Sequence, residues 1–178
     1  MNTELENKLM TSYKVEMVSF LKNHPEFFEE AMNLAVADKQ PYSWRAAYLI
    51  WDCMEANDPR VRKHIKKIID VLLSKNDGHQ RELMKILMKL DLPKKYEGFL
   101  FDTCVNIWKE INKQPSVRHT AFRFLIQIVK KYPELVNEID ILLQNQYLTT
   151  LSPGVRKSIF KMVKKCSMFD GRKNVLLH

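Results

Sequence analysis

Apolar residues recur at helical spacing along almost the whole chain. Near the N-terminus, Leu5, Leu9, Tyr13, Met17 and Leu21 fall on one helical stripe, which predicts a long helix over residues 3–22. His24-Pro25 ends this pattern, because proline disfavours helical geometry in the residue before it. No stretch alternates apolar and polar residues for long enough to indicate a strand. Helix is therefore expected for every long segment.

Prolines and turn residues divide the rest of the chain into eight further helices. Most expected helices begin at or just after a proline, where its missing N–H costs little. Asn76-Asp77-Gly78 marks a turn between two of them. The short turns imply antiparallel neighbours within each pair. The expected pairs are 25–38 with 43–56, 58–75 with 78–91, 94–113 with 115–132, and 133–149 with 152–168.

Four arginines recur at almost even spacing near the starts of the second helices. Arg45, Arg81, Arg118 and Arg156 are separated by 36, 37 and 38 residues. Repetition at this period is typical of stacked helix pairs, each burying its apolar face on the next. We expect these arginines to join repeats, with the alkyl stem on a neighbouring pair and the guanidinium on turn carbonyls. A ligand-binding role is the alternative.

The repeat resembles the HEAT/armadillo superfamily of α-solenoids, whose repeats often begin the second helix with a valine–arginine pair. Val117-Arg118 and Val155-Arg156 match that pattern, and Val61-Arg62 matches it at the start of an expected first helix. The resemblance covers about residues 25–168. It implies an all-α fold, an α-α superhelix of about four HEAT-like helix pairs plus an N-terminal capping helix.

The length of 178 residues suits one domain. We expect a single HEAT-like α-solenoid domain over residues 1–168 and a short C-terminal tail over residues 169–178. The expected repeats span about 25–56, 58–91, 94–132 and 133–168.

Positive charge is concentrated in the second half of the chain. The net charge is +8, of which residues 1–89 contribute +1 and residues 90–178 contribute +7. The second helices of the last two pairs carry no acid. If they share a concave face, their cations form a basic strip that suits a phosphate backbone or an acidic protein segment. A solvated surface is the plain alternative. The strip comprises Arg118, Arg123, Lys130, Lys131, Arg156, Lys157, Lys161, Lys164 and Lys165, with Ile159, Phe160 and Val163 expected to face the core.

An aromatic stripe is the second candidate site. Trp44, Tyr48 and Trp51 fall at positions i, i+4 and i+7, and Asp52 lies beside them. Such a stripe is more often core packing. Among the relatives that the resemblance implies, HEAT-like DNA glycosylases that remove alkylated bases use concave tryptophans with an acid and an arginine. Trp44, Trp51 and Asp52 are similar to that set, with Arg118 as a phosphate contact. The chain matches no full motif of these enzymes, so no catalytic residue is assigned.

Motifs for catalysis, cofactors and metals are absent from the sequence. It contains no GxGxxG, P-loop, HExxH or GxSxG pattern. Cys53, Cys104 and Cys166 are widely separated, which favours reduced thiols over disulfides or a zinc site. We therefore expect neither a cofactor nor a metal. The polar, acidic N-terminus is unlike a signal peptide and no run is apolar enough to span a membrane, so a cytoplasmic location is expected.

Together these features favour a non-enzymatic scaffold that recognises an extended partner. A protein partner is expected first, because repeat surfaces of this kind are commonly used in that way. The alternative is a nucleic-acid-binding protein that uses the basic strip and is related to DNA alkylation repair. Affinity for nucleic acid that falls steeply with salt would favour this alternative.

Overall fold

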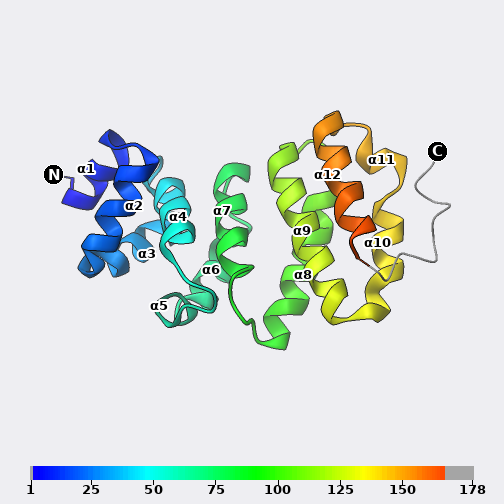
Figure 1. The fold of residues 1–178 in the computed structure, drawn as a ribbon, viewed down its shortest axis with the longest axis horizontal. Coiled ribbons are helices and arrows are strands. Elements are labelled where there is room, and N and C mark those ends of the chain that lie inside the picture. The colour runs from blue at the N-terminus through cyan, green and yellow to red at the C-terminus, as the bar shows by residue number, and fades with distance from the viewer. Residues whose placement is uncertain (1, 167–178) are drawn as a thin grey trace. The chain divides into compact units, whose positions relative to one another are not determined.

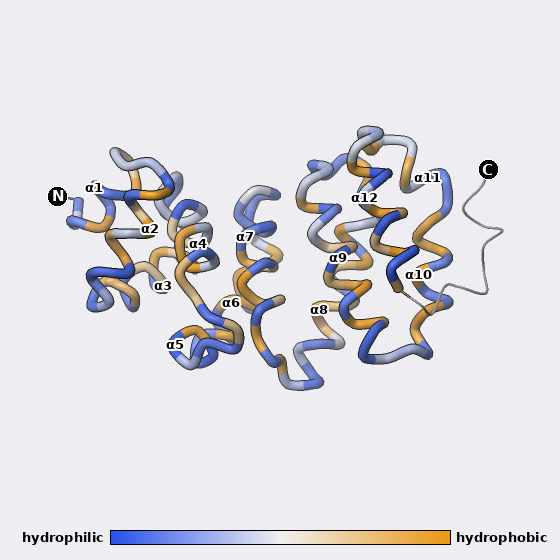
Figure 2. The backbone as a smooth tube through the Cα atoms, in the orientation of Figure 1, coloured by the Kyte–Doolittle hydropathy of each residue, from blue (hydrophilic) through white to orange (hydrophobic). Residues whose placement is uncertain are grey.

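The computed structural model describes residues 2–166, which form twelve α-helices and two short 3-10 helices with no strand (Figure 1). The predicted all-α class is confirmed. Hydrophobic and hydrophilic stretches alternate along the helices, as expected of helices with one buried face (Figure 2). The chain divides into two compact units, Met1–Leu92 (unit 1) and Pro93–His178 (unit 2). The tail predicted over residues 169–178 lies outside the described residues.

The N-terminal segment contains two helices where we predicted one. These are α1 (Glu4–Thr11) and α2 (Lys14–Asn23), separated by extended backbone at Ser12. The backbone N–H of Tyr13 donates a 3.1 Å hydrogen bond to a carboxylate oxygen of Glu16, which starts the second helix. Tyr13 is consequently exposed instead of lying on the apolar stripe. The prediction of one long helix was wrong because a capping interaction overrides the apolar period here.

Unit 1 continues with two helix pairs. Helix α3 packs on α4, helix α6 packs on α7, and the second helices α4 and α7 lie side by side (Figure 1). The helix expected over residues 58–75 is interrupted near Lys63 and His64, so that a short α5 precedes α6. The elements are η1 (Pro25–Phe27), α3 (Phe28–Val36), α4 (Tyr42–Cys53), α5 (Pro59–Arg62), α6 (Ile65–Leu72) and α7 (Asp77–Leu87).

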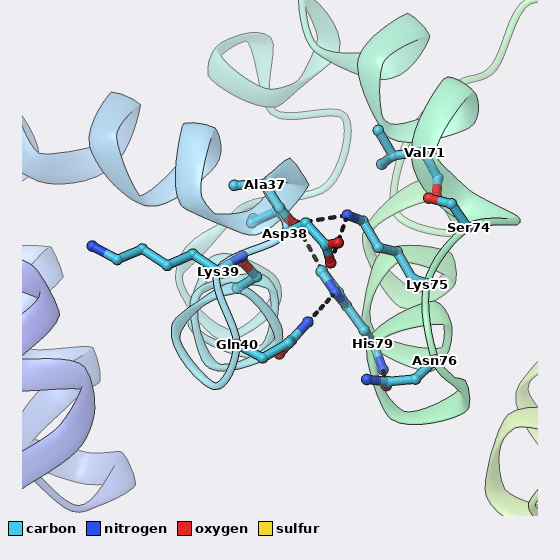
Figure 3. A network of polar contacts seen from close by, with 11 residues as sticks. Ala37, Asp38, Lys39, Gln40, Val71, Ser74, Lys75, Asn76 and His79 are labelled. Atoms are coloured by element: carbon cyan, nitrogen blue, oxygen red, sulfur yellow. Dashed lines mark hydrogen bonds and ion pairs between the residues drawn. The ribbon is translucent and has the colours of Figure 1, made fainter.

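Polar contacts join the turns of these two pairs (Figure 3). The Nζ of Lys75 donates to the carbonyl of Ala37 at 2.9 Å. The buried ring of His79 lies between the carbonyl of Ala35, at 2.8 Å from Nε2, and the side-chain nitrogen of Gln40, at 3.0 Å from Nδ1. Nε2 therefore carries the proton, and Nδ1 accepts a hydrogen bond from the side-chain amide of Gln40. The second pair is fixed to the first by hydrogen bonds as well as by apolar packing.

Unit 2 contains the long pair α8 (Lys94–Lys109) and α9 (Pro115–Lys131), followed by the last pair. The first helix of that last pair, expected over residues 133–149, consists of three short helices. The indole nitrogen of Trp108 donates a hydrogen bond to the carbonyl of Leu142 at the end of α10. In a continuous helix, this carbonyl would instead accept a hydrogen bond from a backbone N–H of the next turn. The elements are η2 (Pro133–Leu135), α10 (Val136–Leu142), α11 (Asn145–Leu148) and α12 (Pro153–Lys164).

Candidate functional site

Arg118 is part of the interior of unit 2 and not of the exposed strip that we predicted. Its side chain is fully buried, and burial lowers the pKa of its guanidinium. The guanidinium donates to the carbonyl of Trp108 at 3.0 Å, to the carbonyl of Tyr147 at 2.5 Å and to the hydroxyl of Thr150 at 2.8 Å. These partners belong to the end of α8 and to the last pair. The expected structural role, in which the arginine joins repeats through turn carbonyls, is confirmed at this position.

The other cations of α9 differ in their surroundings. Lys131 forms a 2.6 Å ion pair with Glu97, which also accepts a 2.9 Å hydrogen bond from the hydroxyl of Tyr132. The pKa of Lys131 is raised, chiefly by that carboxylate. Arg123 and Lys130 are exposed and occupy the side of α9 that also carries His119. Two cations of α9 are therefore available on the surface of unit 2.

Helix α12 carries the densest positive charge. Ser152 caps its N-terminus by accepting the backbone N–H of Val155, and Pro153 occupies its first turn. Ile159 and Val163 are buried and pack the helix onto α9. The opposite side lines an open groove of about 710 Å³, formed by Pro153, Arg156, Lys157, Phe160, Lys161, Lys164 and Lys165. We call the five cations of this groove together with Phe160 the α12 basic face.

The charge of the α12 basic face is not balanced by acids among the described residues. No carboxylate within residues 2–166 forms an ion pair with any of its five cations. Lys164 and Lys165 lie in or just after the last turn, where positive charge complements the helix dipole. The side chain of His119 lies 2.9 Å from the hydroxyl of Ser158, which places the side of α9 that carries Arg123 and Lys130 next to α12. These seven cations are the part of the predicted strip that is neither buried, as Arg118 is, nor paired with a carboxylate among residues 2–166, as the exposed Lys131 is.

Phe160 is the residue of this face that the sequence analysis misplaced. We expected it in the core beside Ile159, but it is half-buried and lines the groove among the cations. Adjacent helical positions differ by about 100° in direction, so only one of two neighbouring apolar residues faces α9 directly. Phe160 lies four residues from both Arg156 and Lys164, and this spacing could have indicated that it shares their side of the helix.

The aromatic stripe of α4 lies within a cluster of unit 1 cations. Trp44, Tyr48, Trp51 and Asp52 are all half-buried, so they are neither full core residues nor an open platform. The Nζ of Lys85 on α7 lies 3.7 Å from the ring centroid of Trp51. Lys89 donates a 2.8 Å hydrogen bond to the carbonyl of Trp51. The ring of Trp51 therefore already has a cation on its face.

The carboxylates of this cluster are also engaged within unit 1. Asp52 lies 3.0 Å from the Nζ of Lys14, which also sits 5.1 Å from the ring of Tyr48. Tyr48 and then Asp52 raise the pKa of Lys14. Glu82 is buried and pairs with Arg81 at 2.7 Å and with Lys85 at 2.6 Å. Charges of both signs neutralise one another here, in contrast to the α12 basic face.

Within residues 2–166, no group of three or more His, Cys, Asp or Glu side chains is placed to hold a metal ion. No helix in the same part of the chain is both long and apolar enough to cross a membrane. Cys104 and Cys166 are buried and form no disulfide with another described residue, and burial raises the pKa of the Cys104 thiol.

The stacked helix pairs make this an all-helical repeat protein, and α12 gives it an exposed basic face. The family model of the HEAT repeat domain matches residues 1–166, and the chain belongs to this family. Comparisons with curated proteins and with solved structures found no match. The expected resemblance to HEAT repeats is thus confirmed, and the family supports a role in binding other molecules.

Proposed function

We propose that this HEAT repeat protein is a non-enzymatic binding module that recognises an extended anionic partner through the α12 basic face. The observation that carries the proposal is the row of five cations on one side of α12, with no carboxylate partner among the described residues. Lysines held close together without counter-charges repel one another, and an anionic ligand relieves that repulsion. HEAT repeats commonly mediate protein interactions, which supports a scaffold role.

The shape of the site suits an extended ligand better than a compact one. Helix α12 has 12 residues and is therefore about 18 Å long, and its cations lie along it from Arg156 to Lys164, with Lys165 just beyond its end. Arg123 and Lys130 on α9 continue the positive surface sideways. An acidic protein segment and a nucleic-acid strand both present negative charges at regular intervals along a chain. The proposed function covers their shared chemistry, an extended polyanion.

Fluorescence anisotropy with labelled polyanions tests this proposal. We expect the full chain to bind an oligoglutamate peptide or an oligonucleotide with a Kd in the micromolar range at low salt, and more weakly as salt is raised. A variant with Lys161→Glu, Lys164→Glu and Lys165→Glu should lose at least tenfold in affinity. Because acids near the end of a helix destabilise it, the corresponding Lys→Gln variant should be measured beside it.

The matched control makes the same change in net charge at a different place on unit 2. Lys94, Lys95 and Lys109 are exposed lysines of α8 in the same unit, and their replacement by Glu alters the net charge equally. This variant should retain most of the affinity. If neither polyanion binds at low salt, or if the control variant loses as much affinity as the α12 variant, the proposed function is wrong.

A further inference from the structure

Phe160 is surrounded by cations on the α12 basic face. Arg156 and Lys164 lie one turn before and after it, and Lys157 lies three residues before it. Residues at these spacings are neighbours on a helix surface, with about 6 Å of rise between positions i and i+4. The phenylalanine is therefore a partly exposed aromatic side chain among the cations that line a groove of about 710 Å³.

The packing of α12 explains why this ring is available. Ile159 and Val163 are almost completely buried and supply the contact with α9, whereas Phe160 lies beside them and lines the groove. In water, such a ring leaves apolar area exposed between strongly hydrated ammonium groups. A ligand with a flat apolar surface and flanking negative charges would cover that area and satisfy the cations together.

We infer that the α12 basic face binds single-stranded nucleic acid, with an unpaired base stacked on Phe160 and backbone phosphates on the surrounding lysines and arginine. This inference rests on the proposed function and names its partner. Positively charged grooves that contain aromatic side chains are the usual means by which proteins hold single strands. At about 3.4 Å per stacked nucleotide, the length of α12 accommodates about five nucleotides.

The ring distinguishes a single strand from the other extended polyanions. The face of an aromatic ring carries partial negative charge, so a carboxylate gains nothing by lying over it. A base has a π face of its own and stacks favourably. In a duplex the bases are already paired and stacked, so they cannot reach a side chain on the surface of one helix without being displaced.

A comparison of ring variants tests the inference. Phe160→Leu keeps an apolar side chain but removes the π face, and it should weaken binding of a labelled oligothymidine about tenfold. Phe160→Trp enlarges the face and should strengthen binding. Phe99→Leu is the matched control, because Phe99 is an exposed phenylalanine on α8 of the same unit. It should leave the affinity unchanged.

The ligand provides a second, independent control. An oligonucleotide of abasic sites has the same phosphates without bases, so it should bind about as weakly to the wild type as oligothymidine binds to Phe160→Leu. The ring variants should bind this abasic strand and oligoglutamate with the same affinity as the wild type does. Preserved folding of each variant is checked by its circular dichroism and unfolding midpoint.

The outcomes separate this inference from the proposed function. Equal affinity for abasic and normal strands, an unchanged affinity in both ring variants, or tighter binding of duplex than of single strand would overturn it. Binding of oligoglutamate alone would also overturn it and identify an acidic protein segment as the partner, leaving the proposed function intact. If no polyanion binds, both this inference and the proposed function are wrong.

Discussion

Arg118 illustrates how a charged residue becomes part of the interior. Its guanidinium is fully buried with its centre 5.0 Å from the ring of Trp108, and it donates to two carbonyls and one hydroxyl. Shortening the side chain would remove all three of these hydrogen bonds. Arg123, on the same helix, is exposed, so the surroundings of an arginine decide its role.

Replacement of Arg118 by Lys should lower the free energy of unfolding by about 3 kcal/mol, because a lysine cannot donate in three directions from the same position. Urea denaturation measures this loss. Arg123→Lys on the exposed side of the same helix should change the stability by less than about 0.5 kcal/mol. Equal stability of the two variants would show that the guanidinium does not join the repeats of unit 2.

His79 gives the protein a pH-dependent stability. Burial lowers the pKa of its ring below the usual value, although the hydrogen bond to Ala35 opposes this. The unfolded chain therefore takes up a proton near pH 6.5 that the folded chain does not, and stability falls as the pH drops below that value. The fall is at most about 1.4 kcal/mol per pH unit for one such group.

Urea midpoints at pH 7.5 and pH 5.5 test this expectation, in a range above the ordinary titration of carboxylates. The wild type should be less stable at pH 5.5, and His79→Gln should reduce the difference. The stability of His79→Gln should still depend on pH to some extent, because burial and then Arg123 lower the pKa of His119 as well. Replacement of the exposed His24 by Gln is the control. An undiminished pH dependence in His79→Gln would contradict the assignment.

At the scale of elements, short-range signals located most helix starts but not every interruption. Asp58-Pro59 and Ser152-Pro153 begin helices as expected, and the side chains of Asp58 and Ser152 accept backbone N–H groups there. The breaks near Ser12 and within residues 133–149 were missed. The first depends on a competing cap and the second coincides with hydrogen bonds from distant residues, neither of which changes the apolar period.

Asp58 is the clearest cap to test. Its buried carboxylate accepts from the backbone of Arg60 at 2.9 Å and of Glu55 at 3.2 Å, and it pairs with the Arg60 side chain at 2.7 Å. Asp58→Ala should cost about 1–2 kcal/mol of stability. Asp70→Ala, which removes an exposed ion pair of α6, should cost about 0.5 kcal/mol or less. Thermal unfolding measures the loss of stability in both variants, and similar losses would contradict the capping role of Asp58.

At the scale of the whole molecule, charge separates the two units. Unit 1 contains 14 Lys and Arg against 14 Asp and Glu, whereas unit 2 contains 15 against 7. The sequence therefore predicted which half carries the basic surface, and the arginine period predicted the repeated helix pairs. It placed Arg118 both in the joints between repeats and in the basic strip, and the structure confirms the first of these roles. It did not predict that Phe160 lies within the basic surface, because helical periodicity does not determine which side of α12 packs on α9.

Amide chemical-shift mapping of the full chain with oligothymidine would show which surface binds the strand. We expect the largest shifts in α12, with smaller ones on the side of α9 that carries Arg123 and Lys130. Helices α4 and α7, with their aromatic stripe, should be little affected. Shifts concentrated on α4 and α7, or the absence of shifts in α12 at saturating ligand, would contradict the assignment of the α12 basic face as the binding surface.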